Sequence, residues 1–281
     1  MAQFKFEKSD GSQNKQAALQ GLMPKIHFGL GVSPRLVGGT SFDDKAALDP
    51  TQVELLADAS LHSIEKTRQI LLSWRRQGHL LADIYIDGIA PAARLMGERW
   101  LADDVDFVHC TIAYSRLHQI LYEFSADFLA EAHIQPNGLS LLLMSEPGSQ
   151  HGLGVFMLSE FFRQAGWSVT LAAPQDIAEF KRIFQSDWFD AVALSISTDR
   201  HIDLVAKAVA ELKEALLNPN LKICVGGPQA SMAPDKLSWP GTHLINSNAR
   251  EVVKRVTDLL DKNSRQPDLT ADRPKRHSVI G

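Results

Sequence analysis

The alternation of short apolar runs and amphipathic helical segments after Gly138 constrains the fold more than any other feature of this sequence. Uniformly apolar strands are typical of a parallel sheet that is covered on both faces. The pattern therefore predicts an α/β class, doubly wound, Rossmann-like domain. The predicted strands are LSLLLMS (139–145), SVTLAA (168–173), DAVALSIS (190–197), LKICVGG (221–227) and THLIN (242–246). The predicted helices between and after them span 155–167, 174–188, 201–217 and 248–262.

The region before the sheet reads as helical. Asp49 is a good N-cap, Pro50 suits the first helical position, and an apolar stripe follows. Three helical segments are predicted, and the second contains Pro91, which kinks or restarts a helix. The sequence predicts a helical bundle, with four helices if Pro91 splits the second segment.

These patterns divide the chain into four parts. Residues 1–48 are polar and glycine-rich and are predicted to be a flexible segment. Residues 49–135 are the predicted helical bundle, which serves as a cap domain. Residues 138–263 are the predicted Rossmann-like domain, and residues 264–281 are predicted to be a disordered tail.

Composition excludes several classes of protein. The formal charge of −4 and the pI of about 6.2 do not favour attraction to nucleic acid. No apolar run approaches the roughly 20 residues of a membrane span, and the N-terminus lacks the apolar stretch of a signal peptide. Cys110 and Cys224 form neither a disulfide framework nor a zinc site, so a cytoplasmic location is expected.

Unusual residues follow three of the predicted strands. His151 lies in the glycine-containing stretch after the first strand, Ser195 and Ser197 end the third, and Gly226 and Gly227 follow the fourth. Ligands of such sheets bind beyond the carboxyl ends of the strands, so these residues are expected to meet at one edge. Neither a dinucleotide fingerprint, a P-loop nor the acidic cluster of a phosphoacceptor domain is present at these positions.

The three motifs resemble those of the cobalamin-binding domain family. Its Asp-x-His-x-x-Gly motif corresponds to SQHGLG, and its Gly-Gly motif to GGPQ. Its Ser-x-Leu or Ser-x-Thr motif corresponds to SIS or SIST, with Ser195 as the matching serine. The resemblance implies cobalamin, as adenosylcobalamin or hydroxocobalamin, with His151 as the lower axial ligand of cobalt. The cofactor-binding residues that it implies are Ser149, Gln150, His151, Gly152, Leu153, Gly154, Ser195, Ser197, Gly226, Gly227, Trp100 and His109.

The chemistry of these residues agrees with that resemblance. Neutral imidazole is a good donor to a transition metal. The Ser195 hydroxyl can donate to a ring nitrogen of the displaced nucleotide tail, and Gly226 and Gly227 let the backbone approach that tail. Ser149 replaces the family's Asp and orients His151 more weakly than a carboxylate would, which favours a sensor over an enzyme that cycles between oxidation states.

The resemblance extends to the helical region. The run Gly97, Glu98 and Trp100 before an Asp-rich turn is similar to the family's cap, where the tryptophan covers the upper corrin face. Light-sensing relatives carry Glu-His after that tryptophan, whereas this chain has Cys110 and Thr111 there, directly after His109. His109 and His27 are the candidate upper ligands.

Ordinary structural roles remain open for each residue. His151 and His27 can be solvated histidines, and Ser195 can cap the next helix. Gly226 and Gly227 can form a turn before Pro228. Trp100 can be a core residue.

A cap followed by a cobalamin domain resembles the AerR/PpaA group of light-responsive antirepressors from photosynthetic bacteria. The resemblance implies a regulator, not an enzyme, that acts on a PpsR/CrtJ-like repressor of photosynthesis genes. Sequence-specific DNA binding by the chain itself and membrane association are not expected. Two alternatives remain: a corrinoid methyl-carrier subunit of a methyltransferase system, and a haem-binding sensor of the same fold.

Overall fold

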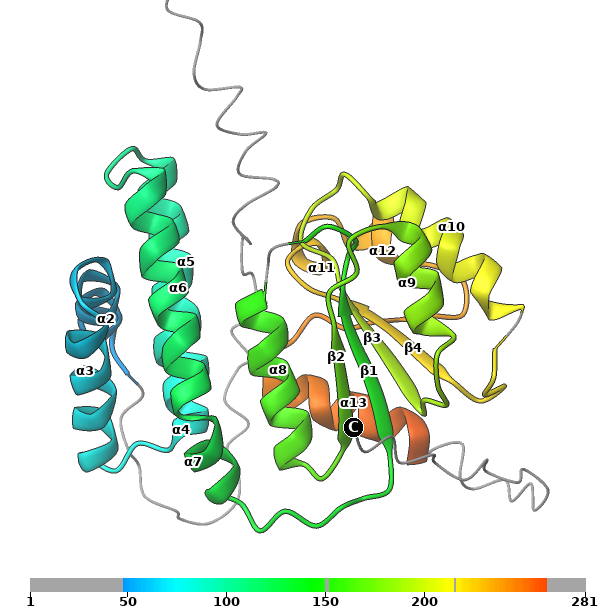
Figure 1. Cartoon of the computed structure of the whole chain (residues 1–281), viewed down its shortest axis with the longest axis horizontal. Helices are drawn as coiled ribbons and strands as arrows, with labels where there is room; N and C mark the ends of the chain where they lie inside the picture. The colour runs from blue at the N-terminus through cyan, green and yellow to red at the C-terminus, as the bar shows by residue number, and fades with distance from the viewer. Residues whose placement is uncertain (1–47, 150–151, 215, 262–281) are drawn as a thin grey trace, which may run out of the picture.

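The computed structural model describes residues 48–149, 152–214 and 216–261. A helical bundle is followed by a parallel five-stranded sheet with helices on both faces, so the predicted fold class is confirmed (Figure 1). The predicted flexible segment, apart from Leu48, and the predicted tail lie outside the described residues. The strands are β1 (Ser140–Ser145), β2 (Ser168–Ala172), β3 (Ala191–Ser195), β4 (Lys222–Gly226) and β5 (His243–Leu244).

The sheet has the order β2-β1-β3-β4-β5, and every neighbouring pair is parallel. Side chains of β1 alternate between two cores, because Leu142 and Met144 face one side and Leu141 and Leu143 the other. Helices α9 (Ile177–Phe184) and α10 (Ile202–Lys213) cover the first face. Helices α8 (Gly152–Gln164) and α13 (Ala249–Asp261) cover the second.

The first helical segment breaks at Ser63, which differs from the prediction of one continuous helix. Asp49 caps α2 (Pro50–His62) in a capping box with Gln52. Ser63 has extended backbone angles, and its hydroxyl accepts from the Lys66 amide at the start of α3 (Ile64–Arg76). The bundle thus gains a helix here, and not at Pro91.

Pro91 is accommodated without a break. The segment α4 (Leu81–Asp83) continues through the π-helix η1 (Ile84–Ile89) into α5 (Ala90–Leu101), where Pro91 occupies the first turn. A π-turn before the proline tolerates its missing backbone donor. The third predicted helix ends earlier than expected, because Phe124 separates α6 (Phe107–Glu123) from α7 (Ser125–Ala130).

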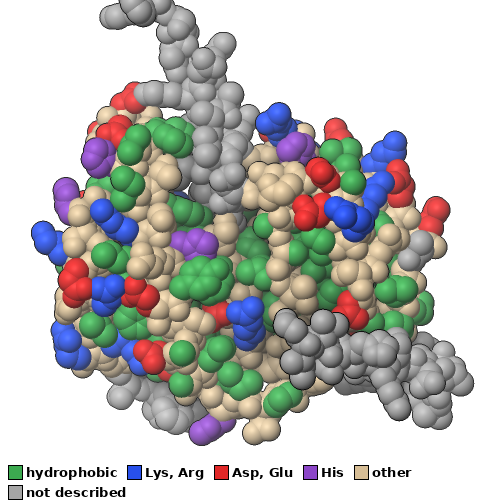
Figure 2. All heavy atoms as spheres, in the orientation of Figure 1, with side chains coloured by type: hydrophobic (Ala, Val, Ile, Leu, Met, Phe, Trp, Pro, Cys, Tyr) green, Lys and Arg blue, Asp and Glu red, His purple; other side chains and the backbone are tan. Residues whose placement is uncertain are grey.

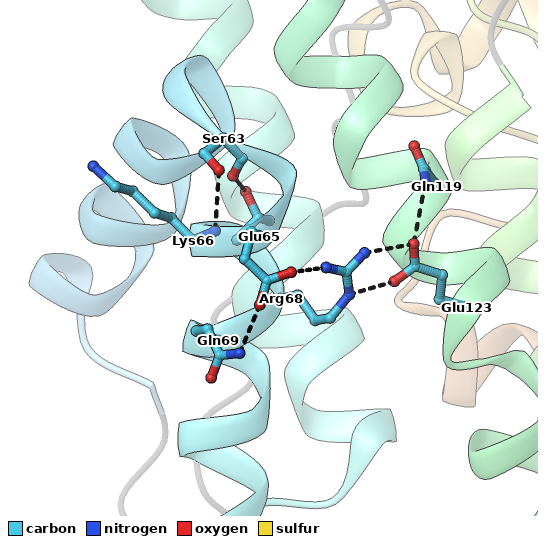
Figure 3. Close-up of polar contacts among 8 residues, drawn as sticks. Ser63, Glu65, Lys66, Arg68, Gln69, Gln119 and Glu123 are labelled. Carbon is cyan, nitrogen blue, oxygen red and sulfur yellow. Dashed lines mark hydrogen bonds and ion pairs between the residues drawn. The ribbon is translucent and has the colours of Figure 1, made fainter.

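An ion-pair network ties α3 to α6 on the outside of the bundle (Figure 3). Arg68 donates to both carboxylate oxygens of Glu123, at 2.8 and 2.9 Å, and also pairs with Glu65. Gln69 and Gln119 donate to the same two carboxylates. Such a bidentate arrangement fixes the angle between two helices more firmly than a single exposed pair does.

Helix α8 belongs to both halves of the molecule. Its residues Phe156 and Phe161 pack into the core of the bundle, whereas Val155 and Phe162 pack on the sheet. Polar contacts across the same boundary include Gln164 Nε2 to the Phe128 carbonyl at 2.7 Å. The cap and the sheet therefore share a continuous packed interface through α8.

Two short helices, α11 (Gln229–Met232) and α12 (Pro234–Leu237), occupy a stretch in which no element was predicted. Helix α8 begins at Gly152, three residues earlier than predicted. Across the described residues, the helices are too short or too polar to cross a membrane.

Candidate cofactor site

The site lies at the carboxyl edge of the sheet, where β1 and β3 are neighbours. The chain leaves β1 toward α8 on one face and leaves β3 toward α10 on the other. This divergence is the topological switch point at which doubly wound sheets bind ligands. The order of the strands therefore brings the three sequence motifs together, as predicted.

An apolar slot with a cavity volume of about 60 Å³ opens between the sheet, α8 and α13. Its floor is hollow because small residues occupy the central strands: Ala193 pairs with Cys224, and Ser195 pairs with Gly226. Burial raises the pKa of Cys224 to about 12, so its thiol is neutral. The predicted site residues that line the slot are Gly154, Ser195, Ser197, Gly226 and Gly227.

Polar atoms in the slot are few. Ser195 is half-buried in the wall of the slot. Ser247, which follows β5, is 5% exposed, and its hydroxyl has no hydrogen-bond partner among the described residues. A long apolar slot with single hydroxyl groups suits a flat heterocycle whose nitrogen needs one donor. The residues present therefore fit the nucleotide tail of cobalamin.

The paired glycines have a structural requirement of their own. Gly227 has a φ of +91°, and a Cβ there would lie 2.7 Å from the Ile196 amide nitrogen. A Cβ on Gly226 would lie 2.9 Å from the Ile245 carbonyl oxygen. The turn before Pro228 thus demands glycines whether or not a ligand is bound, although both also line the slot.

The suggestion that Ser195 caps the next helix is wrong. The N-cap of α10 is His201, and Ser195 lies at the end of β3 in the wall of the slot. Ser197 is buried, and its amide donates to a Glu146 carboxylate oxygen at 2.9 Å. Ser197 therefore lines the slot and is held through its backbone.

Glu146 was missed by the sequence analysis. It directly follows β1, is 2% exposed, and accepts hydrogen bonds from the backbone of Ser197 and Thr198 and from the Ser149 side chain. Burial raises its pKa to about 7, against the opposing effect of these donors. The sequence did contain a signal for Glu146, because an acidic residue directly after an apolar strand lies at the edge of the sheet where ligands bind.

The remaining residues of the first motif have different surroundings. Gln150 and His151 lie outside the described residues. Gly152 starts α8, and a Cβ on it would lie 3.1 Å from the His118 ring. Leu153 is fully buried in the core shared with the bundle, so it contributes packing in this structure.

The cap residues are not gathered at the slot. Trp100 is 6% exposed, belongs to the bundle core and tilts against Phe107 at 5.7 Å between ring centroids. His109 is exposed on α6, and its Nδ1 lies 2.6 Å from the Asp106 carboxylate. The structure thus gives Trp100 a core role, and His27 lies outside the described residues.

His118, two turns beyond His109 on α6, is the histidine that approaches the motif. Its ring lies 5.7 Å from that of Phe156, and its Nε2 is buried without a partner among the described residues. Burial lowers its pKa, so the imidazole is neutral near pH 7. The ring lies beside the first turn of α8, so close to Gly152 that a side chain at that position would press against it.

Fold and slot together define a Rossmann-like domain with a helical cap and an apolar slot at its switch point. Residues 140–256 match the B12 binding domain family. The predicted cofactor, cobalamin, is confirmed at the level of the domain family. Within the described ranges, no three His, Cys, Asp or Glu side chains gather as a metal site.

Two known proteins are similar to this chain, one in sequence and one in structure. The chain is 28% identical over 169 residues to an uncharacterized 20.5 kDa protein in the bchF-crtJ intergenic region of Rhodobacter capsulatus, covering 60% of this chain and 88% of that protein. The monomethylamine corrinoid protein of Methanosarcina barkeri superposes with a TM-score of 0.59 at 14% identity, covering 74% of this chain and 98% of that one. This second likeness shows a shared fold.

Ser247→Ala is expected to weaken cobalamin binding about 3- to 10-fold, because one hydrogen bond contributes roughly 1 kcal/mol. The apoprotein should keep its melting temperature, since the hydroxyl has no partner among the described residues to lose. Absorbance titration and thermal melting measure the two quantities. The exposed Ser238→Ala is the control, and an unchanged affinity in Ser247→Ala would exclude Ser247 from the site.

Proposed function

We propose that the chain is a cobalamin-binding, light-responsive regulator of transcription that acts as an antirepressor on a repressor of photosynthesis genes. The relative from the bchF-crtJ intergenic region is the observation that carries the regulatory part of this proposal. The name crtJ is that of the repressor type that the AerR/PpaA resemblance implies as the partner. The cofactor part depends on the B12-binding domain and the apolar slot.

The proposed protein does not catalyse a reaction and acts by contact with the repressor. Its net charge of −4 disfavours binding to DNA phosphates. The face seen in Figure 2 carries acidic and basic side chains interspersed, without a continuous basic stripe. A regulator that acts on a DNA-bound repressor is expected to be located in the cytoplasm.

The holoprotein alone is expected to show no sequence-specific mobility shift with a photosynthesis-gene promoter, and to release that promoter from the purified repressor. Phosphate neutralisation requires a basic face, which supports the first expectation. The measurement compares specific with scrambled DNA at several salt concentrations. Tight specific binding without repressor would overturn the partner mechanism.

Light is proposed to act at the upper face of cobalt. Visible light can cleave a cobalt–carbon bond, and loss of the upper group leaves a space that close packing does not tolerate unchanged. His27 or His109 is the proposed replacement ligand. In His109, Nδ1 lies 2.6 Å from the Asp106 carboxylate, so Nε2 is the ring nitrogen that would bind cobalt.

The deciding experiment compares dark and illuminated holoprotein by absorption spectrum and by repressor pull-down, in wild type and in His27→Ala. The absorption spectrum distinguishes a bound corrinoid from bound haem, and so tests the haem-binding alternative. Methyl transfer to a methyltransferase partner, with no response to repressor or light, would support the carrier alternative. If both readouts change but His27→Ala behaves as wild type, ligand capture by His27 alone is excluded.

A further inference from the structure

Glu146 is the carboxylate buried deepest at the carboxyl edge of β1. Its side chain is 2% exposed, and it stands between the end of β1 and the loop that follows β3. Burying an ionisable group costs several kcal/mol unless hydrogen bonds compensate. A carboxyl group at this position therefore requires the donors that surround it.

Those donors come from the loops of two motifs. From the loop after β3, the Ser197 amide donates at 2.9 Å and the Thr198 amide donates to the same carboxyl group. The Glu146 amide in turn donates to the Ser195 carbonyl at 3.1 Å. Gln229, from the turn after β4, donates to the Ser197 carbonyl at 3.4 Å, so all three motif loops join one network.

The first motif is held by the same carboxyl group. The Ser149 hydroxyl donates to the Glu146 carboxyl group, and the Ser149 amide donates to the Glu146 carbonyl at 3.1 Å. Ser149 occupies the position at which the family motif carries its acid. A carboxylate is thus present one hydrogen bond away from that position, supplied by a residue three places earlier in the chain.

We propose that Glu146 is the positioning acid of the cobalamin site, acting through Ser149 in place of the carboxylate that position 149 lacks. This inference rests on the proposed cobalamin binding and adds a residue to it. Glu146 fixes the start of the segment that leads to α8, and it fixes that segment against the loop of Ser195 and Ser197. Outer-shell acids of this kind orient metal-ligand loops and raise affinity for the metal group.

The protonation state of Glu146 is expected to affect cobalamin binding. Burial raises the pKa of Glu146 to about 7, and the influences on it within the described structure are hydrogen-bond donors, not neighbouring charges. As an ionised group it accepts from Ser149, Ser197 and Thr198, whereas protonation removes one acceptor site. The network should therefore loosen as pH falls through neutrality, and cobalamin binding should weaken with it.

The test begins with Glu146→Gln, which keeps the size of the side chain and removes its charge. Hydroxocobalamin titration is expected to show a 10- to 100-fold loss of affinity, the usual range for an outer-shell residue. The ratio of wild-type to variant affinity should grow between about pH 6 and 8, because protonation of a cobalt-binding imidazole lowers the affinity of both proteins alike. Ser149→Asp, added to Glu146→Gln, returns an acid to the motif position and should recover most of the affinity.

Ser149→Ala is a second test of the inference, which remains valid if Glu146→Gln fails to fold. Ser149 is only half-buried, so this variant should fold as wild type and lose about 3- to 10-fold in affinity. Circular dichroism and melting of each apoprotein check the fold. Unchanged affinity in Ser149→Ala, or a Glu146→Gln loss that is the same at every pH and is not rescued by Ser149→Asp, overturns the inference. Failure of wild type to bind hydroxocobalamin would instead contradict the proposed function.

Discussion

His151→Ala is expected to lower the affinity for cobalamin by at least about 100-fold and to abolish the spectrum of imidazole-ligated cobalt. Outer-shell residues of metal sites cost 10- to 100-fold when removed, and a direct ligand should cost at least as much. In the sequence, His151 falls between Ser145, the last residue of β1, and Gly152, the first of α8. The melting temperature of the apoprotein should therefore stay close to the wild-type value.

The measurement is an absorbance titration with hydroxocobalamin, repeated with added imidazole. Free imidazole can enter the vacated position, so partial recovery of the spectrum is expected in His151→Ala. His133→Ala, an exposed histidine just after α7, is the matched control and should bind as wild type. Undiminished binding with an unchanged cobalt spectrum in His151→Ala would contradict the ligand assignment.

The fold was predictable because the strongest signals in the sequence are local. Continuous apolar strands that alternate with amphipathic helices leave few arrangements other than a covered parallel sheet. The break at Ser63 was not predicted, because a serine inside an apolar stripe is compatible with one helix as well as with two. Helices α11 and α12 are four residues each, too short for a periodic pattern to register.

The slot was predicted only in part. Ser195, Gly226 and Gly227 line it as the motifs indicated. Its depth comes from Ala193 and Cys224, two small residues within apolar strands that look like ordinary core in the sequence. Ser247 was not found because its exposure to the slot depends on where β5 ends, which no local pattern fixes.

The reading of Ser149 shows a further limit of sequence motifs. The missing acid at that position favoured a sensor over a methyl carrier in the sequence analysis. In the folded chain the Ser149 hydroxyl donates to Glu146, so a carboxylate is present near the motif despite its absence from position 149. The separation of regulator from carrier therefore depends on the partner and light experiments and not on residue 149.

Ala193→Leu is expected to reduce cobalamin binding by about 100-fold or more, because it fills the floor of the slot. Ala193 lies between Leu143 and Cys224 in register, on the face covered by α8 and α13. Because Ala193 lines the slot, the added carbons would extend into it, and the apoprotein should lose no more than the roughly 1–3 kcal/mol of an overpacked core. A hundredfold loss corresponds to about 2.7 kcal/mol of binding free energy.

The decisive comparison uses two corrinoids, cobalamin and cobinamide, which lacks the nucleotide tail. If the slot holds the tail, Ala193→Leu should lose affinity for cobalamin and keep its affinity for cobinamide, since cobinamide has no nucleotide to place in the slot. Ala173→Leu, an exposed site just after β2, adds the same side chain away from the slot and should bind both as wild type. Equal losses for both corrinoids would point to a distorted sheet, whereas no loss for either would mean that the tail lies elsewhere. The pair of ligands thus separates occupancy of the slot from ligation of the cobalt, which His151→Ala tests independently.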